Sequence, residues 1–314
     1  MNSTKENALS IATSLVFFLM SISLLAQNPI IRHVRTADPS AHIWDNSGTL
    51  WIYTSGDPDD AVDYTTMDGY RAFSTTDMVN FKDHGVILHS KDISWGVPGF
   101  MFAPTFAFKN GKYYCIYPHA YDSVEFKDKF YCGVAVSDVP QGPFKDIGII
   151  EGVSGNWIDP CVFTDDDGTS YLYWGVYQPK VAKLKDNMLE LAEEPRDIDY
   201  GEDNFFEAVY MHKKDGLYYF SYNTGTKGQK GGDYSIGDNP YGPFEHKGDI
   251  NPWQLQDHHS IIEFKGQWYF FYHVDDWNGG TGFRRNTCVE YLDYNEDGTL
   301  VPVKRTKKGV EAVK

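Results

Sequence analysis

The stretch Gly216-Leu-Tyr-Tyr-Phe-Ser-Tyr222 carries the pattern that decides the fold: a turn glycine followed by a short strand rich in aromatic residues. The pattern occurs five times, with intervals of 63, 57, 48 and 50 residues between successive glycines. The copies begin at Gly48, Gly111, Gly168, Gly216 and Gly266. Each interval is long enough for a blade of four strands, so the repeat predicts an all-β, five-bladed β-propeller. An irregular β-sandwich is the alternative.

Two further signals accompany the repeat. The dipeptides Asn110-Gly111 and Asp215-Gly216 are typical of tight hairpin turns, so each aromatic strand is expected to pair with the strand before it. Two of the copies are followed by a shared tail, Gln141-Gly-Pro-Phe144 and Tyr241-Gly-Pro-Phe244. Repetition on this scale favours the propeller over the sandwich.

The composition agrees with a protein rich in strands and turns. Aromatic residues make up 16% of the 314 residues, and 29 glycines are spread over the whole length. The formal net charge is −16 at pH 7. A chain this acidic repels the phosphates of nucleic acids and of anionic membranes, so neither is expected as a partner.

The N-terminal segment has the features of a secretory signal peptide. Lys5 precedes an apolar run from Ala8 to Leu25, and the small residue Ala26 follows it. We predict a signal peptide at residues 1–26 and a single propeller domain at residues 27–314, in a secreted or periplasmic protein. An uncleaved membrane anchor is the alternative for the first segment, whereas the mature chain is not expected to insert into a membrane.

The cysteines do not form the framework of a small disulfide-rich protein. There are four, and they are dispersed: Cys115, Cys132, Cys161 and Cys288. In a chain of this length they are expected to be small buried residues. A disulfide between Cys115 and Cys132 is the alternative in an oxidising compartment.

The positions ahead of each turn glycine carry the candidate site residues. In a propeller the innermost strand of each blade runs beside the central axis, so equivalent residues of different blades converge. These positions hold Asp38, Thr105, Asp159, Glu207 and His258, which lie 10, 6, 9, 9 and 8 residues before their glycines. Singly, the carboxylic acids can be read as turn formers or solvated strand residues. Together they predict an active site, because buried carboxylates are costly unless they are paired or functional.

Three clustered carboxyl groups suit the hydrolysis of glycosidic bonds. One group protonates the leaving oxygen, while a second, ionised group activates a water molecule or attacks the sugar. A third carboxyl group raises the pKa of the first by charge repulsion and keeps it protonated near neutral pH.

The motifs around these residues resemble those of glycoside hydrolase family 43 over residues 32–305. The likeness rests on Ala37-Asp38-Pro39-Ser40, Trp157-Ile158-Asp159-Pro160, Phe205-Phe206-Glu207-Ala208 and His258-His259-Ser260. It implies that Asp38 is the general base, that Asp159 tunes the pKa of the acid and orients it, and that Glu207 is the general acid. The implied reaction inverts the anomeric centre, which requires acid and base to stand about 6.5–9.5 Å apart.

The resemblance also implies how the sugar is held. It places Arg285 at the substrate, together with the hydroxyl of Thr105, where other members of the family have a carboxylate. The aromatic floor is expected to be Phe102, Trp44 or Trp95. The loop from residue 56 to residue 69 is expected to rim the pocket, with most of its acidic residues solvated.

No cofactor is required by the resemblance, although members of the family often carry a calcium ion on the propeller axis. A histidine at the position of His258 then binds the ion, with water as the other ligands. Because calcium prefers oxygen ligands, a histidine that is simply hydrogen-bonded within the polar centre is the alternative.

The function implied by the resemblance is the release of a pentose from an oligo- or polysaccharide, with an exo-acting α-L-arabinofuranosidase as the first expectation. A β-xylosidase, an endo-arabinanase or a β-1,3-galactosidase of the same family is the alternative. The related fructan- and sucrose-cleaving hydrolases usually have arginine and cysteine where this chain has Ile158 and Ala208. An alternative of another class is a non-catalytic propeller that binds sugar. The sequence predicts no oligomeric state.

Overall fold

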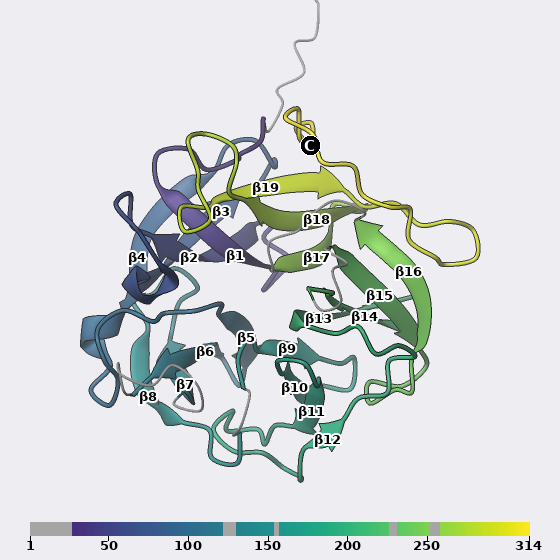
Figure 1. Ribbon diagram of the computed structural model, residues 1–314, viewed down its shortest axis with the longest axis horizontal. Coiled ribbons are helices and arrows are strands. Elements are labelled where there is room, and N and C mark those ends of the chain that lie inside the picture. Colours follow the sequence, from purple (N-terminus) through teal and green to yellow (C-terminus); the bar gives the residue numbers. More distant parts are fainter. Residues whose placement is uncertain (1–26, 122–129, 154–156, 226–230, 252–257) are drawn as a thin grey trace, which may run out of the picture.

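The computed structural model describes residues 27–121, 130–153, 157–225, 231–251 and 258–314. The predicted signal peptide lies outside these ranges. Five antiparallel sheets surround a central axis in chain order (Figure 1). The prediction of an all-β five-bladed propeller is therefore confirmed. Within the described residues, no helix is long and apolar enough to cross a membrane.

Each blade contributes its first strand to the inside of the ring. The strands of blade 1 are β1 (Arg35–His42), β2 (Leu50–Asp57), β3 (Gly69–Thr75) and β4 (Lys82–His89). Those of blade 2 are β5 (Thr105–Lys109), β6 (Lys112–Ala120), β7 (Phe130–Ser137) and β8 (Lys145–Ile149). Those of blade 3 are β9 (Cys161–Thr164), β10 (Ser170–Trp174), β11 (Lys180–Lys183) and β12 (Arg196–Asp197).

Blades 4 and 5 complete the ring. The strands of blade 4 are β13 (Glu207–Lys214), β14 (Leu217–Asn223), β15 (Gly232–Gly237) and β16 (Glu245–Asn251). Blade 5 has β17 (His259–Phe264), β18 (Gln267–Val274) and β19 (Asn286–Tyr291). Two short 3₁₀ helices, η1 (Tyr64–Thr66) and η2 (Ser90–Asp92), lie in the connections on either side of β3 and β4.

The turn glycines of the repeat close the inner hairpins. Asn110 and Gly111 have φ values of +51° and +76°, and Asp215 and Gly216 have values of +51° and +82°. Two consecutive residues with positive φ are the requirement of the type I′ turn, which matches the twist of paired strands. These dipeptides therefore explain why the aromatic strands of blades 2 and 4 fold back against the strands before them.

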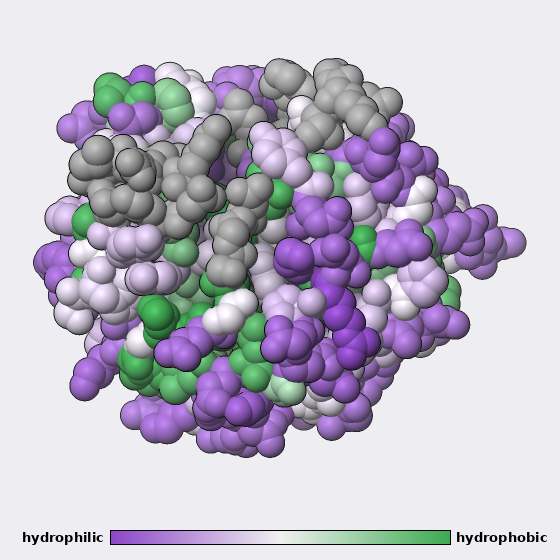
Figure 2. Space-filling model, turned by 60° about the horizontal axis from the view of Figure 1, so that its bottom comes forward, coloured by the Kyte–Doolittle hydropathy of each residue, from purple (hydrophilic) through white to green (hydrophobic). Residues whose placement is uncertain are grey.

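The prolines directly before the shared Gly-Pro-Phe tails join neighbouring blades. The Tyr53 hydroxyl in blade 1 donates a hydrogen bond to the Pro140 carbonyl of blade 2 over 2.9 Å. The Tyr173 hydroxyl in blade 3 donates in the same way to Pro240 of blade 4 over 2.7 Å. Buried tyrosines, which supply both apolar area and a polar tip, thus fill the spaces between blades. Hydrophilic side chains predominate among the described residues on the face seen in Figure 2, in line with the charge of the chain.

The four cysteines are free and buried, as expected from the sequence. The alternative of a Cys115–Cys132 disulfide is wrong. On the paired strands β6 and β7, Cys115 lies opposite Ala135 and Cys132 lies opposite Pro118, so the two thiols do not face each other. Burial raises the pKa of both thiols, which keeps them protonated and unreactive.

The segment that leads into β1 closes the ring against blade 5. The Ile30 N–H donates to the Thr287 carbonyl on β19 over 2.9 Å. The buried side chain of Asn28 copies the pairing of a strand residue, since its amide donates to the Val289 carbonyl (3.0 Å) and its oxygen accepts from the Val289 N–H (2.9 Å). The first residues of the described chain and its last strand therefore form one seam.

Replacing Asn28 by alanine is expected to lower the free energy of unfolding by about 2–3 kcal/mol, because it leaves buried donors and acceptors of β19 without partners. Urea unfolding of the purified protein, followed by tryptophan fluorescence, measures the change. Gln27→Ala is the matched control, because the neighbouring Gln27 is exposed. Equal stabilities of the two variants would show that the seam contributes nothing.

Candidate active site

Four of the five sequence-predicted residues meet at one pocket of about 170 Å³ on the propeller axis. Asp38 lies in β1, Asp159 precedes β9, Glu207 begins β13 and His258 precedes β17. Each of these strands is the innermost strand of a different blade. The lining residues are Asp38, Tyr64, Met67, Phe102, Ala103, Ile158, Asp159, Glu207, His258 and Arg285.

The backbone around the carboxyl groups is left-handed at equivalent places. The φ values of Asp38, Asp159 and Ala208 are +52°, +58° and +59°. The register of β1 against β2 shifts beyond Ala37, and that of β13 against β14 shifts beyond Glu207, as at β-bulges. Such conformations cost about 1–3 kcal/mol for residues with a Cβ atom and concentrate at functional sites. The bulges turn the side chains out of the regular strand pattern at this pocket.

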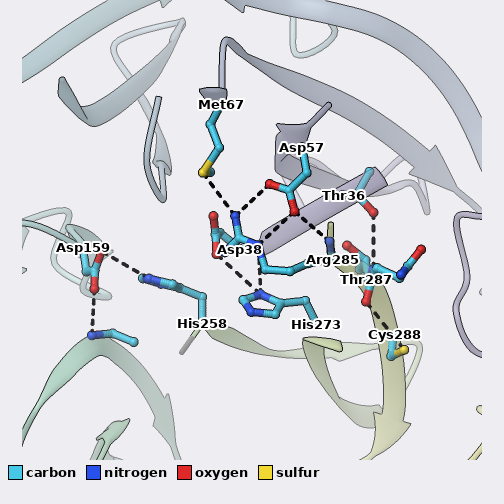
Figure 3. A network of polar contacts seen from close by, with 12 residues as sticks. Thr36, Asp38, Asp57, Met67, Asp159, His258, His273, Arg285, Thr287 and Cys288 are labelled. Atoms are coloured by element: carbon cyan, nitrogen blue, oxygen red, sulfur yellow. Dashed lines mark hydrogen bonds and ion pairs between the residues drawn. The ribbon is translucent and has the colours of Figure 1, made fainter. Parts of the chain in front are cut away.

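Asp38 is held by a buried arginine that it shares with a second carboxylate (Figure 3). Arg285 Nη1 donates to Asp38 Oδ1 over 2.9 Å. Arg285 Nε and Nη2 donate to the two oxygens of Asp57 over 2.9 and 2.8 Å. The fork geometry of the guanidinium suits this bidentate pairing, so Asp57 fixes the plane from which Arg285 reaches Asp38.

The charges around Asp38 keep it ionised. Burial raises the pKa of Asp38, but the positive charge of Arg285, together with the Ser55 hydroxyl, outweighs burial and lowers the pKa to about 2. The Asp38 N–H donates to His273 Nδ1 over 3.1 Å. Burial also lowers the pKa of His273 far below its usual value, so this ring is a neutral acceptor.

Asp159 acts on the backbone beside Glu207. Its Oδ2 accepts a hydrogen bond from the Ala208 N–H over 3.2 Å, and its Oδ1 lies 3.1 Å from His258 Nε2. Ala208 is the left-handed residue that follows Glu207. Asp159 therefore helps to hold the main-chain conformation that aims the Glu207 side chain.

The other predicted substrate residues separate into two groups. Phe102 and Arg285 line the pocket. Trp44 does not, because it lies beyond the end of β1 in another cavity, where its indole N–H donates to the Tyr53 hydroxyl. Trp95 also lies away from the pocket and donates to Asp146. The Thr105 hydroxyl accepts from the Val162 N–H over 3.0 Å and so joins blade 2 to blade 3.

The sequence model of glycosyl hydrolases family 43 matches residues 26–300. The chain belongs to this family. A xylosidase/arabinosidase of Humicola insolens is 37% identical, over 88% of this chain and 99% of the relative. A β-xylosidase of Xylanibacter ruminicola is 32% identical, over 85% of this chain and 96% of the relative. The family-43 chain is therefore a glycoside hydrolase, and the alternative of a non-catalytic sugar-binding propeller is set aside.

Solved family-43 structures share the fold closely. A β-xylosidase/α-arabinofuranosidase from a compost microbial metagenome, in complex with xylotriose and in a calcium-free form, has a TM-score of 0.80 and 36% identity. The match covers 90% of this chain and 98% of that one. A β-xylosidase structure with 34% identity has a TM-score of 0.78 and covers 90% of this chain and 99% of that one.

The donor set of this family-43 site does not fit a protein-held calcium ion. In the described ranges, no group of three or more His, Cys, Asp and Glu side chains is placed to hold a metal. His258 offers one nitrogen, whereas calcium prefers six to eight oxygens, and that nitrogen faces Asp159 (Figure 3). Here His258 is the partner of Asp159.

Reasoning from sequence missed several residues of the family-43 site. Asp57 was counted among the acids of the loop from residue 56 to residue 69, yet it ends β2 and is buried against Arg285. Tyr64 and Met67 of the same loop line the pocket. The sequence feature that could have pointed to these residues is the position of their loop, which directly follows a predicted inner hairpin.

Proposed function

We propose that the protein is an inverting, exo-acting pentosidase that releases single β-D-xylose or α-L-arabinofuranose units from chains derived from xylan or arabinoxylan. The supporting observation is a small pocket walled by three carboxyl groups. Its volume of about 170 Å³ is below the 300–1,000 Å³ of pockets that enclose larger ligands, which suits one terminal sugar. Arabinose was the first expectation from the sequence. Because the relatives are named xylosidase/arabinosidase, the proposal includes xylose equally.

The proposed mechanism gives each carboxyl group one task. Glu207 donates its proton to the glycosidic oxygen as the bond from that oxygen to C1 breaks. Asp38 takes a proton from the water molecule that forms the new bond to C1 on the opposite face of the ring. Asp159 and His258 hold the backbone beside Glu207 in place. Both protons are accounted for, and the sugar leaves with inverted configuration.

The same proposal covers where the enzyme acts. A polysaccharide substrate lies outside the cell membrane, and the predicted signal peptide with cleavage near Ala26 suits a secreted or periplasmic enzyme. The acidic composition agrees with a neutral substrate, because a negatively charged protein repels anions but does not repel an uncharged sugar chain.

A panel of aryl glycosides is expected to give turnover of the β-D-xyloside and of the α-L-arabinofuranoside, and none of the β-D-galactoside. Proton NMR in the first minutes of reaction is expected to show α-xylose from the β-xyloside, before mutarotation. Release of β-xylose would exclude the inverting mechanism. Inactivity on both pentosides, with activity on linear arabinan, would replace exo action by endo action.

A further inference from the structure

The loop between β10 and β11 presents an exposed aromatic ring. Tyr177 is 60% exposed, the highest value for an aromatic side chain in the described part of the chain. Its φ is +64°, a left-handed conformation that is unfavourable for a residue with a Cβ atom. A ring that is neither buried nor relaxed in its backbone contributes little to packing, and this combination is typical of a functional position.

The loop is tied to the wall of the pocket at two points. The Gly175 N–H donates to the carbonyl of Ile158, a lining residue, over 3.2 Å. The Tyr177 N–H donates over 2.8 Å to the carbonyl of Phe206, which directly precedes Glu207. A Cβ atom at Gly175 would lie 2.3 Å from the Gln178 carbonyl oxygen, so the turn is tight. Tyr177 is therefore fixed relative to the acid.

A second ring extends the surface between Tyr177 and Glu207. The rings of Tyr177 and Phe206 have centroids 5.4 Å apart. On the other side, the backbone of Gly225 packs so closely that a Cβ atom there would lie 2.6 Å from the Phe206 ring. Phe206 is thus clamped, and Tyr177 forms the open end of a short aromatic ledge. Neither ring lines the pocket itself.

The ledge is attached to the residue directly before Glu207, the proposed acid. A general acid has to reach the oxygen of the leaving sugar, so that sugar lies next to Glu207 rather than next to Asp38. A pyranose presents a face of C–H groups that packs on an aromatic ring. We propose that Tyr177 is the platform that binds the first sugar of the leaving chain, in a substrate built like a xylo-oligosaccharide. This inference rests on the proposed role of Glu207 as the acid.

Tyr131 in blade 2 provides a matched comparison. It is 39% exposed and stacks on Tyr121, with ring centroids 4.4 Å apart. It is thus also an exposed tyrosine in an aromatic pair, but it lies on β7 of blade 2 and not in the segment that is hydrogen-bonded to the residue before Glu207. If the leaving chain crossed blade 2 instead, Tyr131 would be the residue that matters.

The first test compares two substrates that deliver the same sugar to the pocket. The leaving group of xylobiose is a sugar, whereas the leaving group of β-D-xylosyl fluoride is a fluoride ion, which cannot contact Tyr177 as a sugar would. For Tyr177→Asn, whose new residue tolerates a left-handed backbone, the ratio of kcat/KM for xylobiose to that for the fluoride is expected to fall about tenfold. Tyr177→Phe keeps the ring and is expected to keep most of the ratio. Tyr131→Asn is the control.

The second test measures binding without turnover. Xylotriose is titrated into Glu207→Gln and into the Glu207→Gln, Tyr177→Asn double variant, and the double variant is expected to bind about tenfold more weakly. Normal hydrolysis with unchanged ratio and unchanged affinity would overturn the platform and leave the proposed function standing. An effect of Tyr131→Asn in place of Tyr177→Asn would do the same. If Glu207→Gln alone failed to bind xylotriose, both the Tyr177 platform and the proposed function would be overturned.

Discussion

Replacing Glu207 by glutamine is expected to lower kcat on xylobiose about a thousandfold, because the amide has no proton to give to the leaving oxygen. The variant is expected to bind xylotriose with nearly unchanged affinity, since glutamine matches glutamate in size. The loss should be much smaller for an aryl glycoside with a strongly acidic phenol, which departs without protonation. Steady-state kinetics on the two substrates measures the difference.

The control for this experiment is Glu245→Gln, because the Glu245 side chain in β16 is 79% exposed and pairs with Lys247. It is expected to behave as the wild type on both substrates. Equal losses on xylobiose and on the activated aryl glycoside would rule out Glu207 as the acid, since proton donation matters less as the leaving group improves.

Asp38→Asn is expected to lower kcat about ten-thousandfold on every glycoside, whatever its leaving group, because the base acts on water. Arg285 keeps its bidentate pairing with Asp57 in this variant, so the fold should persist. Azide needs no deprotonation, and its attack on C1 from the water side is expected to restore turnover and give an inverted glycosyl azide. A retained azide product would instead assign Asp38 the role of the acid/base of a retaining enzyme, in which azide attacks a glycosyl intermediate formed on another carboxylate.

The same variant has a second signature in the pH dependence of stability. Because the pKa of Asp38 is lowered from 3.8 to about 2 on folding, its ionised form contributes about 2 kcal/mol to stability above pH 4. The contribution is lost as pH falls from about 4 towards 2. Urea unfolding is expected to show the stability difference between the wild type and Asp38→Asn shrinking over this range. A constant difference would mean that Arg285 does not lower the pKa of Asp38.

The repeat allowed the ring and the meeting of its acids to be predicted, because equivalent positions in a propeller share one axis. It was harder to predict which residues farther along the same strand could reach the bound sugar. Trp44 is six residues after Asp38, and at about 3.3 Å per residue it lies roughly 20 Å along the strand direction, too far for the same sugar. Asp57 could not be distinguished from its acidic neighbours, since its burial depends on Arg285, 228 residues away in the chain.

The metal and Thr105 show the limits of reading roles from resemblance. His258 occupies the position expected from the sequence, and its nitrogen lies 3.1 Å from Asp159 of another blade, as in the alternative of a hydrogen-bonded histidine. Thr105 begins the innermost strand of blade 2, as expected, yet it does not line the pocket, and its hydroxyl accepts a hydrogen bond from the Val162 N–H of the next blade. A position in a repeat predicts where a residue lies, and its hydrogen-bond partners decide its task.

The seam between Asn28 and β19 sets the order in which this protein can be completed. Its two sides are 261 residues apart in the chain, so one side is synthesised long before the other. The opening segment must wait, unpaired, while four blades form behind it. Contacts of such long range form late and slowly, and until then the outer edge of β19 is open to other strands. A chaperone that shields the first residues would therefore raise the yield of active enzyme more than one that binds the middle of the chain.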